Sequence, residues 1–236
     1  MTTKDVTMPY SFSLALHTGE KKEAIIFNRK ALAKQLSFTT PPYFVLANQT
    51  HSDNIVIIDR QKTQGWEREE DAIESCDALI TNLPDVVLCV LTADCVPILL
   101  YDPQTEVIAT VHAGWRGSAS KIVQKTVEKM QHTFGTKPKN ILASIAPAIG
   151  QCCYEVNEDV IENFKAYPHA YSETKTNKYM LDLANINHTQ LLDAGLISTH
   201  IEVSNICTSC QVKTYFSYRK EQGCSGRFVS FIGMQN

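Results

Sequence analysis

Short runs of β-branched and aromatic residues recur along the chain and predict a fold built largely from strands. Branched side chains have few rotamers in a helix and pack well on a pleated surface. We expect strands over residues 43–47, 54–59, 86–91, 96–101, 107–111, 140–146, 201–207 and 228–233.

Helical patterns fall between these runs. An early helix is indicated by Ile25, Leu32 and Leu36, and a clearer apolar stripe covers residues 119–130. Ser118 or Ser120 is the expected cap of the second helix, and Gly135 its end. Two more helices are expected, one starting at Asn157 and one over residues 182–195.

The irregular order of these elements favours an α/β fold of the α+β kind, in which mixed β-sheets are layered with helices. A doubly wound parallel sheet would need a regular alternation of strand and helix. No repeat, low-complexity tract or Pro/Gly/Ser linker divides the 236 residues. We therefore expect a single compact domain over residues 1–236.

The composition excludes several classes of protein. Hydrophobic residues make up 44% and charged residues 20%, as in ordinary globular chains. The net charge is −3 without a basic stripe, so nucleic acid is not an expected partner. No secretory pattern opens the chain, and no apolar run is long enough to cross a membrane. Eight cysteines in such a chain indicate thiols or ligands in a reducing cytoplasm.

Three polar segments interrupt the apolar runs, and each carries a side chain that can bind a metal. These segments contain His51, Cys95 and His112. Catalytic zinc keeps three nitrogen or sulfur ligands from the protein and one open position, so the three residues fit a zinc site. Their spacing matches neither a zinc finger nor HExxH. An ordinary fold, with a capping His51, a buried Cys95 and a backbone-bonded His112, fits them too.

Further polar residues are candidates for binding substrate. Arg116 lies in the glycine-containing turn after His112 and can hold phosphate, although an ordinary turn with a solvated arginine is equally compatible. Tyr218 can stack on a nucleobase and Arg219 can bind a phosphate or ribose oxygen, unless this stretch is only a polar loop. Gln49 and Asp94 can align ligands or substrate.

The remaining cysteines and histidines give weaker signals. Cys207 and Cys210 form one CxxC without a second pair, so a zinc ribbon is not predicted, and a redox role stays open. Cys152 and Cys153 are adjacent in the chain. The other residues are expected in the core (Cys76, Cys89) or as surface and capping groups (His17, His132, His169, His188, His200).

Several segments taken together resemble the laccase-domain, YfiH-like family of purine nucleoside phosphorylases, also called the multicopper polyphenol oxidoreductase family. TADC at 92–95 with HAGWRG at 112–117 is the most specific pair. The other matching segments are NR at 28–29, NQTHS at 48–52, CDALIT at 76–81, LTADCVPILLYDP at 91–103, APAIGQCCYEV at 146–156, and FSYRK with GCSGR near the end.

The resemblance implies that His51, Cys95 and His112 are zinc ligands, with copper as a possible substitute. It implies purine nucleosides and phosphate as partners, with adenosine, inosine or methylthioadenosine converted to base and sugar 1-phosphate. Adenosine deamination is implied as a further activity. The expected catalytic residues are Cys95, His112 and Arg116. The expected substrate-binding residues are Arg29, Gln49, Tyr218 and Arg219.

Other functions share these residues. A cysteine hydrolase or amidase, for example one acting on a peptidoglycan precursor, would use Cys95 as nucleophile and His112 as base, and would not need His51. A polyphenol oxidase is a further alternative, although the chain has no HxH pair of the kind that multicopper sites use. A non-enzymatic module could stack a purine near Tyr218. The sequence leaves the number of subunits open.

Overall fold

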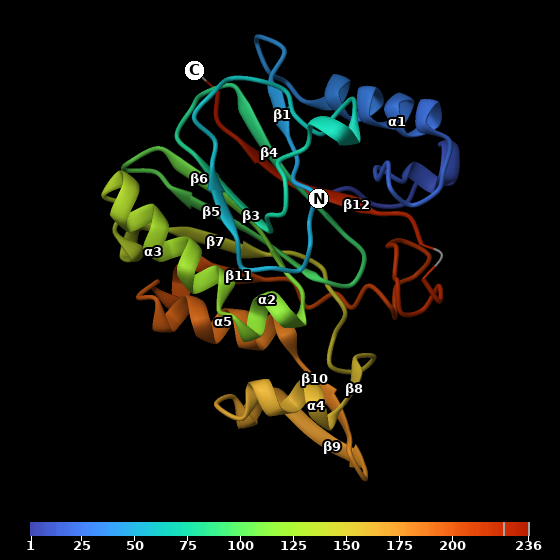
Figure 1. The fold of residues 1–236 in the computed structure, drawn as a ribbon, viewed down its shortest axis with the longest axis vertical. Coiled ribbons are helices and arrows are strands. Elements are labelled where there is room, and N and C mark those ends of the chain that lie inside the picture. Colours follow the sequence, from blue (N-terminus) through green and yellow to red (C-terminus); the bar gives the residue numbers. More distant parts are fainter. Residues whose placement is uncertain (224, 236) are drawn as a thin grey trace.

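Three β-sheets form the framework of the computed structural model, which describes residues 1–223 and 225–235 (Figure 1). The largest has six strands in the order β11 (Ile201–Val203), β7 (Leu142–Ile145), β5 (Val96–Asp102), β6 (Val107–Ala113), β3 (Ala78–Thr81) and β2 (Ile55–Ile57). A second sheet has the order β1 (Tyr43–Val45), β4 (Val86–Thr92) and β12 (Phe228–Gly233). The third has the order β8 (Glu155–Asn157), β10 (Lys178–Leu181) and β9 (Tyr171–Lys175).

The two larger sheets pack face to face between helices. Side chains of β4 alternate, with Leu88 in the apolar cluster between the sheets and Val87 in the cluster that includes Leu32 of α1 (Lys22–Gln35). On the far face of the six-stranded sheet lie α3 (Ile122–Phe134) and α5 (Leu183–Asp193), whose apolar residues share one core with β5 and β6. The layers therefore run helix, sheet, sheet, helix (Figure 1).

Smaller elements complete the chain. The third sheet and α4 (Glu158–Ile161) lie at one end of the molecule (Figure 1), and their buried residues belong to the same core as β5 and β6. The short α2 (Trp115–Ala119) precedes α3. Short 3-10 helices cover Pro9–Phe12, Glu69–Asp71, Pro138–Asn140, Glu162–Phe164, Pro168–Ala170 and Ser198–His200. Within the described residues, no helix combines the length and apolar character needed to cross a membrane.

The mixed α/β class predicted from the sequence is confirmed, because parallel and antiparallel pairs occur in both larger sheets. The predicted cap at Ser118 or Ser120 is wrong, since α3 starts after Lys121, which has a left-handed φ of 59°. The predicted strand over residues 201–207 ends at Val203. That residues 1–236 form one domain remains a prediction.

Candidate metal centre

The register of β3 and β6 brings Asp77 opposite His112. Ala78 pairs with Val111, so the next antiparallel pair is Asp77 with His112. The His112 N–H donates to the Asp77 carbonyl oxygen at 2.7 Å, and His112 Nδ1 lies 2.7 Å from Asp77 Oδ1. Both residues are 3% exposed. With Nδ1 directed at a carboxylate, Nε2 of His112 is free to bind a metal.

The same carboxylate holds the loop that carries His51. Asp77 accepts hydrogen bonds from the backbone N–H groups of His51 at 3.0 Å and Ser52 at 2.7 Å. These bonds support the left-handed backbone of His51, which has a φ of 60°. Burial raises the pKa of Asp77, but hydrogen bonds from His112 and Ser52 outweigh it and lower the pKa to about 2. An ionised Asp77 therefore orients the His112 imidazole and fixes the backbone that carries His51.

Cys95 reaches these imidazoles from the connection between the two larger sheets. The chain leaves β4 in the three-stranded sheet and enters β5 in the six-stranded sheet within a few residues, and Asp94 in this turn has a φ of 87°. Cys95 Sγ lies 3.9 Å from His51 Nε2. Ligand atoms of His51, Cys95 and His112 all lie within 4.8 Å of one another.

The donor set and the space around it fit a single metal ion. Ligand atoms around a tetrahedral zinc with two nitrogens and a sulfur lie about 3.3–3.6 Å apart, so the 3.9 Å between Cys95 Sγ and His51 Nε2 is within a few tenths of an ångström of this geometry. A β-carbon added at Gly114 would lie 2.9 Å from His51 Cδ2 and 3.2 Å from Cys95 Sγ. Glycine therefore leaves the room that these two side chains need.

The neighbouring histidines favour the thiolate form of Cys95. Burial raises the pKa of Cys95, but the charge and hydrogen bond of His112, with help from His51, lower it to about 6. Burial lowers the pKa of His112, whereas the Cys95 thiolate and Asp77 raise it to about 9. In the metal-free protein at neutral pH, the pair is therefore a thiolate beside an imidazolium. A thiolate is the form that binds metals and attacks electrophiles.

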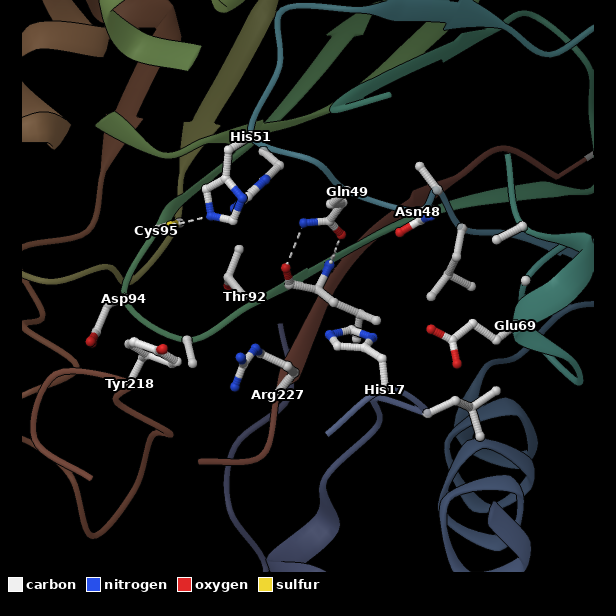
Figure 2. Close-up of a pocket in the computed structure, with 18 of the residues that line it drawn as sticks. His17, Asn48, Gln49, His51, Glu69, Thr92, Asp94, Cys95, Tyr218 and Arg227 are labelled. Atoms are coloured by element: carbon white, nitrogen blue, oxygen red, sulfur yellow. Dashed lines mark hydrogen bonds between the residues drawn. The ribbon is translucent and has the colours of Figure 1, made fainter. Parts of the chain in front are cut away.

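A pocket of about 560 Å³ opens onto the three residues (Figure 2). This volume suits a small organic ligand. Its lining combines apolar residues (Leu16, Leu46, Leu91, Ile149), aromatic residues (Trp115, Tyr154, Tyr218) and cations (Arg219, Arg227). The pocket can therefore take a flat, partly apolar group together with an anion.

Two predicted substrate-binding residues line the pocket while bonding to the protein itself. Gln49 Nε2 donates to the Leu91 carbonyl oxygen at 2.8 Å, and the Leu91 N–H donates to Gln49 Oε1 at 2.9 Å. Arg29 is 2% exposed, and its Nε donates to the Leu14 carbonyl oxygen at 2.8 Å. Arg29 Nη1 donates to the carbonyl oxygens of Gly65 and Trp66. Direct contact of either side chain with substrate stays a prediction.

Tyr218 and Arg219 also line the pocket, and Asp94 holds their segment. Asp94 Oδ2 accepts the backbone N–H of Arg219 at 2.7 Å and the Ser217 hydroxyl at 3.1 Å. Tyr218 is 55% exposed, so its ring is accessible for stacking. The Arg219 guanidinium lies 5.1 Å from the centre of the Tyr154 ring.

Arg116 occupies a different position from the other predicted site residues. It is exposed on α2, its guanidinium lies 4.3 Å from the centre of the Trp115 ring, and it is not among the residues that line the pocket. Trp115 itself lines the pocket. A catalytic role of Arg116 therefore stays a prediction, because its side chain does not itself line the pocket.

Sequence reasoning missed four residues of the site: Asp77, His17, Tyr154 and Arg227. Asp77 lies in the matching segment at 76–81 but was assigned no role there, although a metal-binding histidine calls for a nearby acceptor. His17 was expected at the surface, yet it lines the pocket (Figure 2). Arg227 lies beside Tyr218, with its guanidinium 5.6 Å from the centre of that ring. Tyr154 and Arg227 lie within the matching segments at 146–156 and 223–227 but were assigned no role there, and no local pattern distinguished His17.

The chain is similar over most of its length to a described protein family and to solved structures. Residues 4–235 match the family model described as "Multi-copper polyphenol oxidoreductase laccase". The chain is 34% identical to the purine nucleoside phosphorylase YlmD of Bacillus subtilis (strain 168), covering 95% of this chain and 82% of that protein. It is 35% identical to adenosine deaminase RL5 from an unknown prokaryotic organism, covering 94% and 86%. The crystal structure of YlmD from Geobacillus stearothermophilus matches with a TM-score of 0.92 and 34% identity, over 99% and 88% of the two chains.

Proposed function

The chain belongs to the family described as multi-copper polyphenol oxidoreductase laccase, and we propose that it acts as a metal-dependent purine nucleoside phosphorylase. The resemblance drawn from the sequence motifs is thereby confirmed at the level of the family. One observation carries the proposal: His51, Cys95 and His112 converge at a pocket with aromatic and cationic walls. The activity named for the B. subtilis relative supplies the reaction class.

In this proposal His51, Cys95 and His112 hold one zinc ion, and copper is a possible substitute because the same donors suit both metals. Bound zinc would supply Lewis-acid chemistry at the position that the protein leaves open. Asp77 keeps Nε2 of His112 available, and it fixes the loop of His51. The chain therefore contributes a rigid three-ligand site.

The pocket walls offer separate contacts for the purine and for phosphate. In this proposal the Tyr218 ring stacks on the purine, and Arg219 and Arg227, which line the same pocket, bind phosphate. Burial lowers the pKa of Arg227, but guanidinium groups remain charged at neutral pH. We propose that adenosine, inosine and methylthioadenosine are cleaved to base and sugar 1-phosphate. Substrate contacts of Gln49 and Arg29 and a catalytic role of Arg116 also belong to this proposal.

Product analysis tests the reaction class. Purified protein, loaded with zinc, is incubated with each nucleoside with and without phosphate, and the products are separated by chromatography. The proposal predicts free purine and pentose 1-phosphate that appear only with phosphate and disappear in His51→Ala. Base release that is equally fast without phosphate would indicate hydrolysis and would contradict phosphorolysis.

Adenosine deamination is a second candidate function, favoured by the 35% identity to the relative named adenosine deaminase RL5. The same incubation separates it from phosphorolysis, because deamination converts adenosine to inosine and ammonia without phosphate. Both activities need the same metal ligands in this proposal. His51→Ala should therefore abolish both.

The alternatives from the sequence make different predictions at His51. A cysteine hydrolase needs only Cys95 and His112, yet His51 Nε2 also lies 3.9 Å from the sulfur. Multicopper oxidation needs several histidine-rich copper sites, whereas the described residues offer one His-Cys-His group and one group of four cysteines. We also propose a cytoplasmic location, since none of the cysteines in the described part of the chain forms a disulfide.

A further inference from the structure

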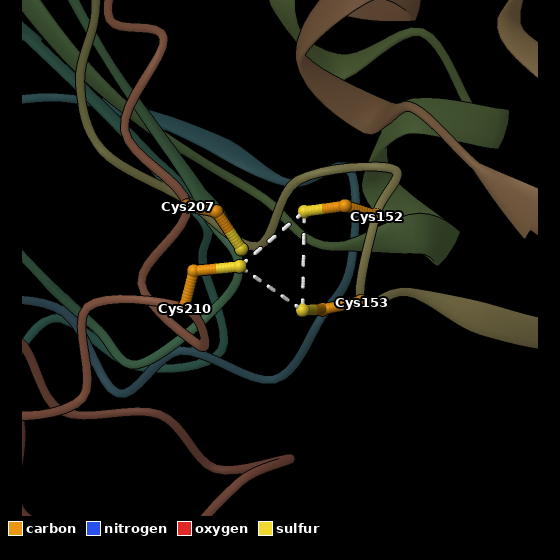
Figure 3. Close-up of side chains that lie close together, drawn as sticks. All are labelled: Cys152, Cys153, Cys207 and Cys210. Atoms are coloured by element: carbon orange, nitrogen blue, oxygen red, sulfur yellow. Dashed lines mark hydrogen bonds between the residues drawn. The ribbon is translucent and has the colours of Figure 1, made fainter.

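Four cysteines from two loops that are far apart in the sequence meet in the structure (Figure 3). Cys152 and Cys153 lie in the turn between β7 and β8, and Cys207 and Cys210 follow β11. A parallel bridge between Ala148 and Cys207 holds the two loops together. The fold thus brings Cys152 and Cys153 next to the CxxC formed by Cys207 and Cys210, which has no second CxxC in the sequence.

The sulfur positions have the dimensions of a tetrahedral metal site. Cys152 Sγ lies 3.8 Å from Cys153 Sγ and 3.6 Å from Cys210 Sγ, and Cys153 Sγ lies 3.4 Å from Cys210 Sγ. All four sulfurs lie within 4.8 Å of one another. A zinc ion with bonds of about 2.3 Å to four sulfurs places them about 3.8 Å apart. A cluster of several iron atoms would hold its cysteines further apart.

The backbone around the sulfurs is arranged to receive them. The Gly150 N–H donates to Cys207 Sγ at 3.2 Å, a contact that stabilises a thiolate. A β-carbon at Gly150 would lie 3.2 Å from Cys207 Cβ and 3.4 Å from Cys152 Sγ. The turn also closes on itself, because the Cys153 N–H donates to the Gly150 carbonyl oxygen at 3.0 Å. Glycine at this position lets the two loops approach.

We propose that Cys152, Cys153, Cys207 and Cys210 bind a second, structural zinc ion. Four sulfur ligands fill a tetrahedral shell and leave no position for water or substrate, as in structural zinc sites. On binding, each cysteine forms one zinc–sulfur bond as a thiolate, and every cysteine that starts as a thiol releases its proton to solvent. No oxidant or reductant takes part in this step.

The position of the four cysteines explains what this ion would stabilise. The neighbouring Ile149 N–H donates to the Asp94 carbonyl oxygen at 2.8 Å, and the Thr208 hydroxyl donates to Asp94 Oδ1 at 2.6 Å. Tyr154, directly after Cys153, lines the pocket. A metal between the loops would therefore fix the contacts that orient Asp94, the residue directly before Cys95. The inference does not depend on the reaction that the pocket catalyses.

His51→Ala isolates the proposed second site, because it disables the His51, Cys95 and His112 centre without touching the four cysteines. Protein purified without chelator and exchanged into zinc-free buffer is analysed for metal content and by zinc-edge X-ray absorption. We expect about one zinc per His51→Ala chain, surrounded by four sulfurs at about 2.3 Å. Adding Cys207→Ser and Cys210→Ser should remove this zinc, whereas adding Cys89→Ala, a control at a buried thiol elsewhere, should leave it.

Three outcomes would overturn the proposal. His51→Ala protein could retain no zinc after supply of the metal, or its zinc could show nitrogen and oxygen ligands. Alkylation and mass spectrometry of the unreduced protein could also reveal a disulfide among the four cysteines. If the serine variant does not fold, the ligand set measured for His51→Ala alone still decides the matter.

Discussion

Asp77 is the residue on which the geometry of the candidate metal centre depends most. One buried carboxylate accepts from the His112 ring and from the backbone of the His51 loop. Its pKa of about 2 keeps it ionised at every pH at which the protein would be assayed. A single side chain thus orients the ring of His112 and holds the backbone of His51, two proposed ligands that lie far apart in the sequence.

Asp77→Asn should weaken metal binding while the protein stays folded. The amide has the same shape but removes the charge and can present N–H to His112, which disfavours the tautomer that leaves Nε2 free. Loss of such a partner costs roughly 10- to 100-fold in metal affinity. Competition with a chromophoric chelator measures the affinity, with Asp53→Asn, at an exposed ion pair, as the control. Equal affinity in Asp77→Asn and wild type would refute the assignment.

Cys95 should react as a thiolate at unusually low pH in metal-free protein. Its pKa is lowered to about 6, so the reactive fraction rises as pH increases through about 6, below the ordinary range near about 8.5. Alkylation of the Cys95 peptide, followed by mass spectrometry after chelator treatment, gives the profile. His112→Ala should move the midpoint upward, because it removes the main stabilising charge. A wild-type midpoint near the ordinary value would show that the coupling is absent.

Among the elements, the strands with long apolar runs and the longer helices were predicted, whereas the short strands β3, β8, β9 and β10 were not. Runs such as residues 86–91 and 96–101 are apolar because both faces of β4 and β5 are covered, and the sequence carries this signal directly. Strand β9 was missed because its residues are mostly exposed and polar. The cap of α3 was missed because Lys121 adopts a left-handed backbone that serine patterns do not reveal.

The turn from β6 into α2 makes a sharp prediction at Gly114. Its backbone is extended, with a φ of −69°, so alanine is compatible with the chain itself. The added carbon would instead crowd His51 and Cys95, and overpacking of about 1–3 kcal/mol corresponds to roughly 5- to 150-fold weaker metal binding. Metal titration and circular dichroism measure affinity and folding, with Ser120→Ala at the end of the same helix as the control. Unchanged affinity in Gly114→Ala would contradict the proposed ligand geometry.

At the scale of the whole molecule, the site forms where the two larger sheets and the C-terminal loop meet. Spacing in the sequence could not predict that His51, Cys95 and His112 converge, because the distance between them is set by sheet packing. Their motifs made the residues recognisable through family resemblance. Arg227 and His17 come from opposite ends of the chain, and only the folded structure places them at one pocket.

Substitutions of Tyr218 test whether the nucleoside stacks on this ring. Tyr218→Ala should raise KM for nucleosides by roughly 2- to 10-fold, because a stacking contact contributes about 0.5–1.5 kcal/mol. Tyr218→Phe keeps the ring and should stay close to wild type. The side chain is 55% exposed, so the melting temperature should change little in either variant. Steady-state kinetics that show the same KM for Ala and wild type would exclude stacking on this residue.

Anomalous diffraction tests the central claim most directly. A crystal of protein purified without chelator and supplied with zinc is measured above and below the zinc absorption edge. The account predicts a peak about 2.0–2.3 Å from His51 Nε2, Cys95 Sγ and His112 Nε2, with the fourth side facing the pocket. No peak among these three atoms, in a crystal that binds zinc elsewhere, would contradict it.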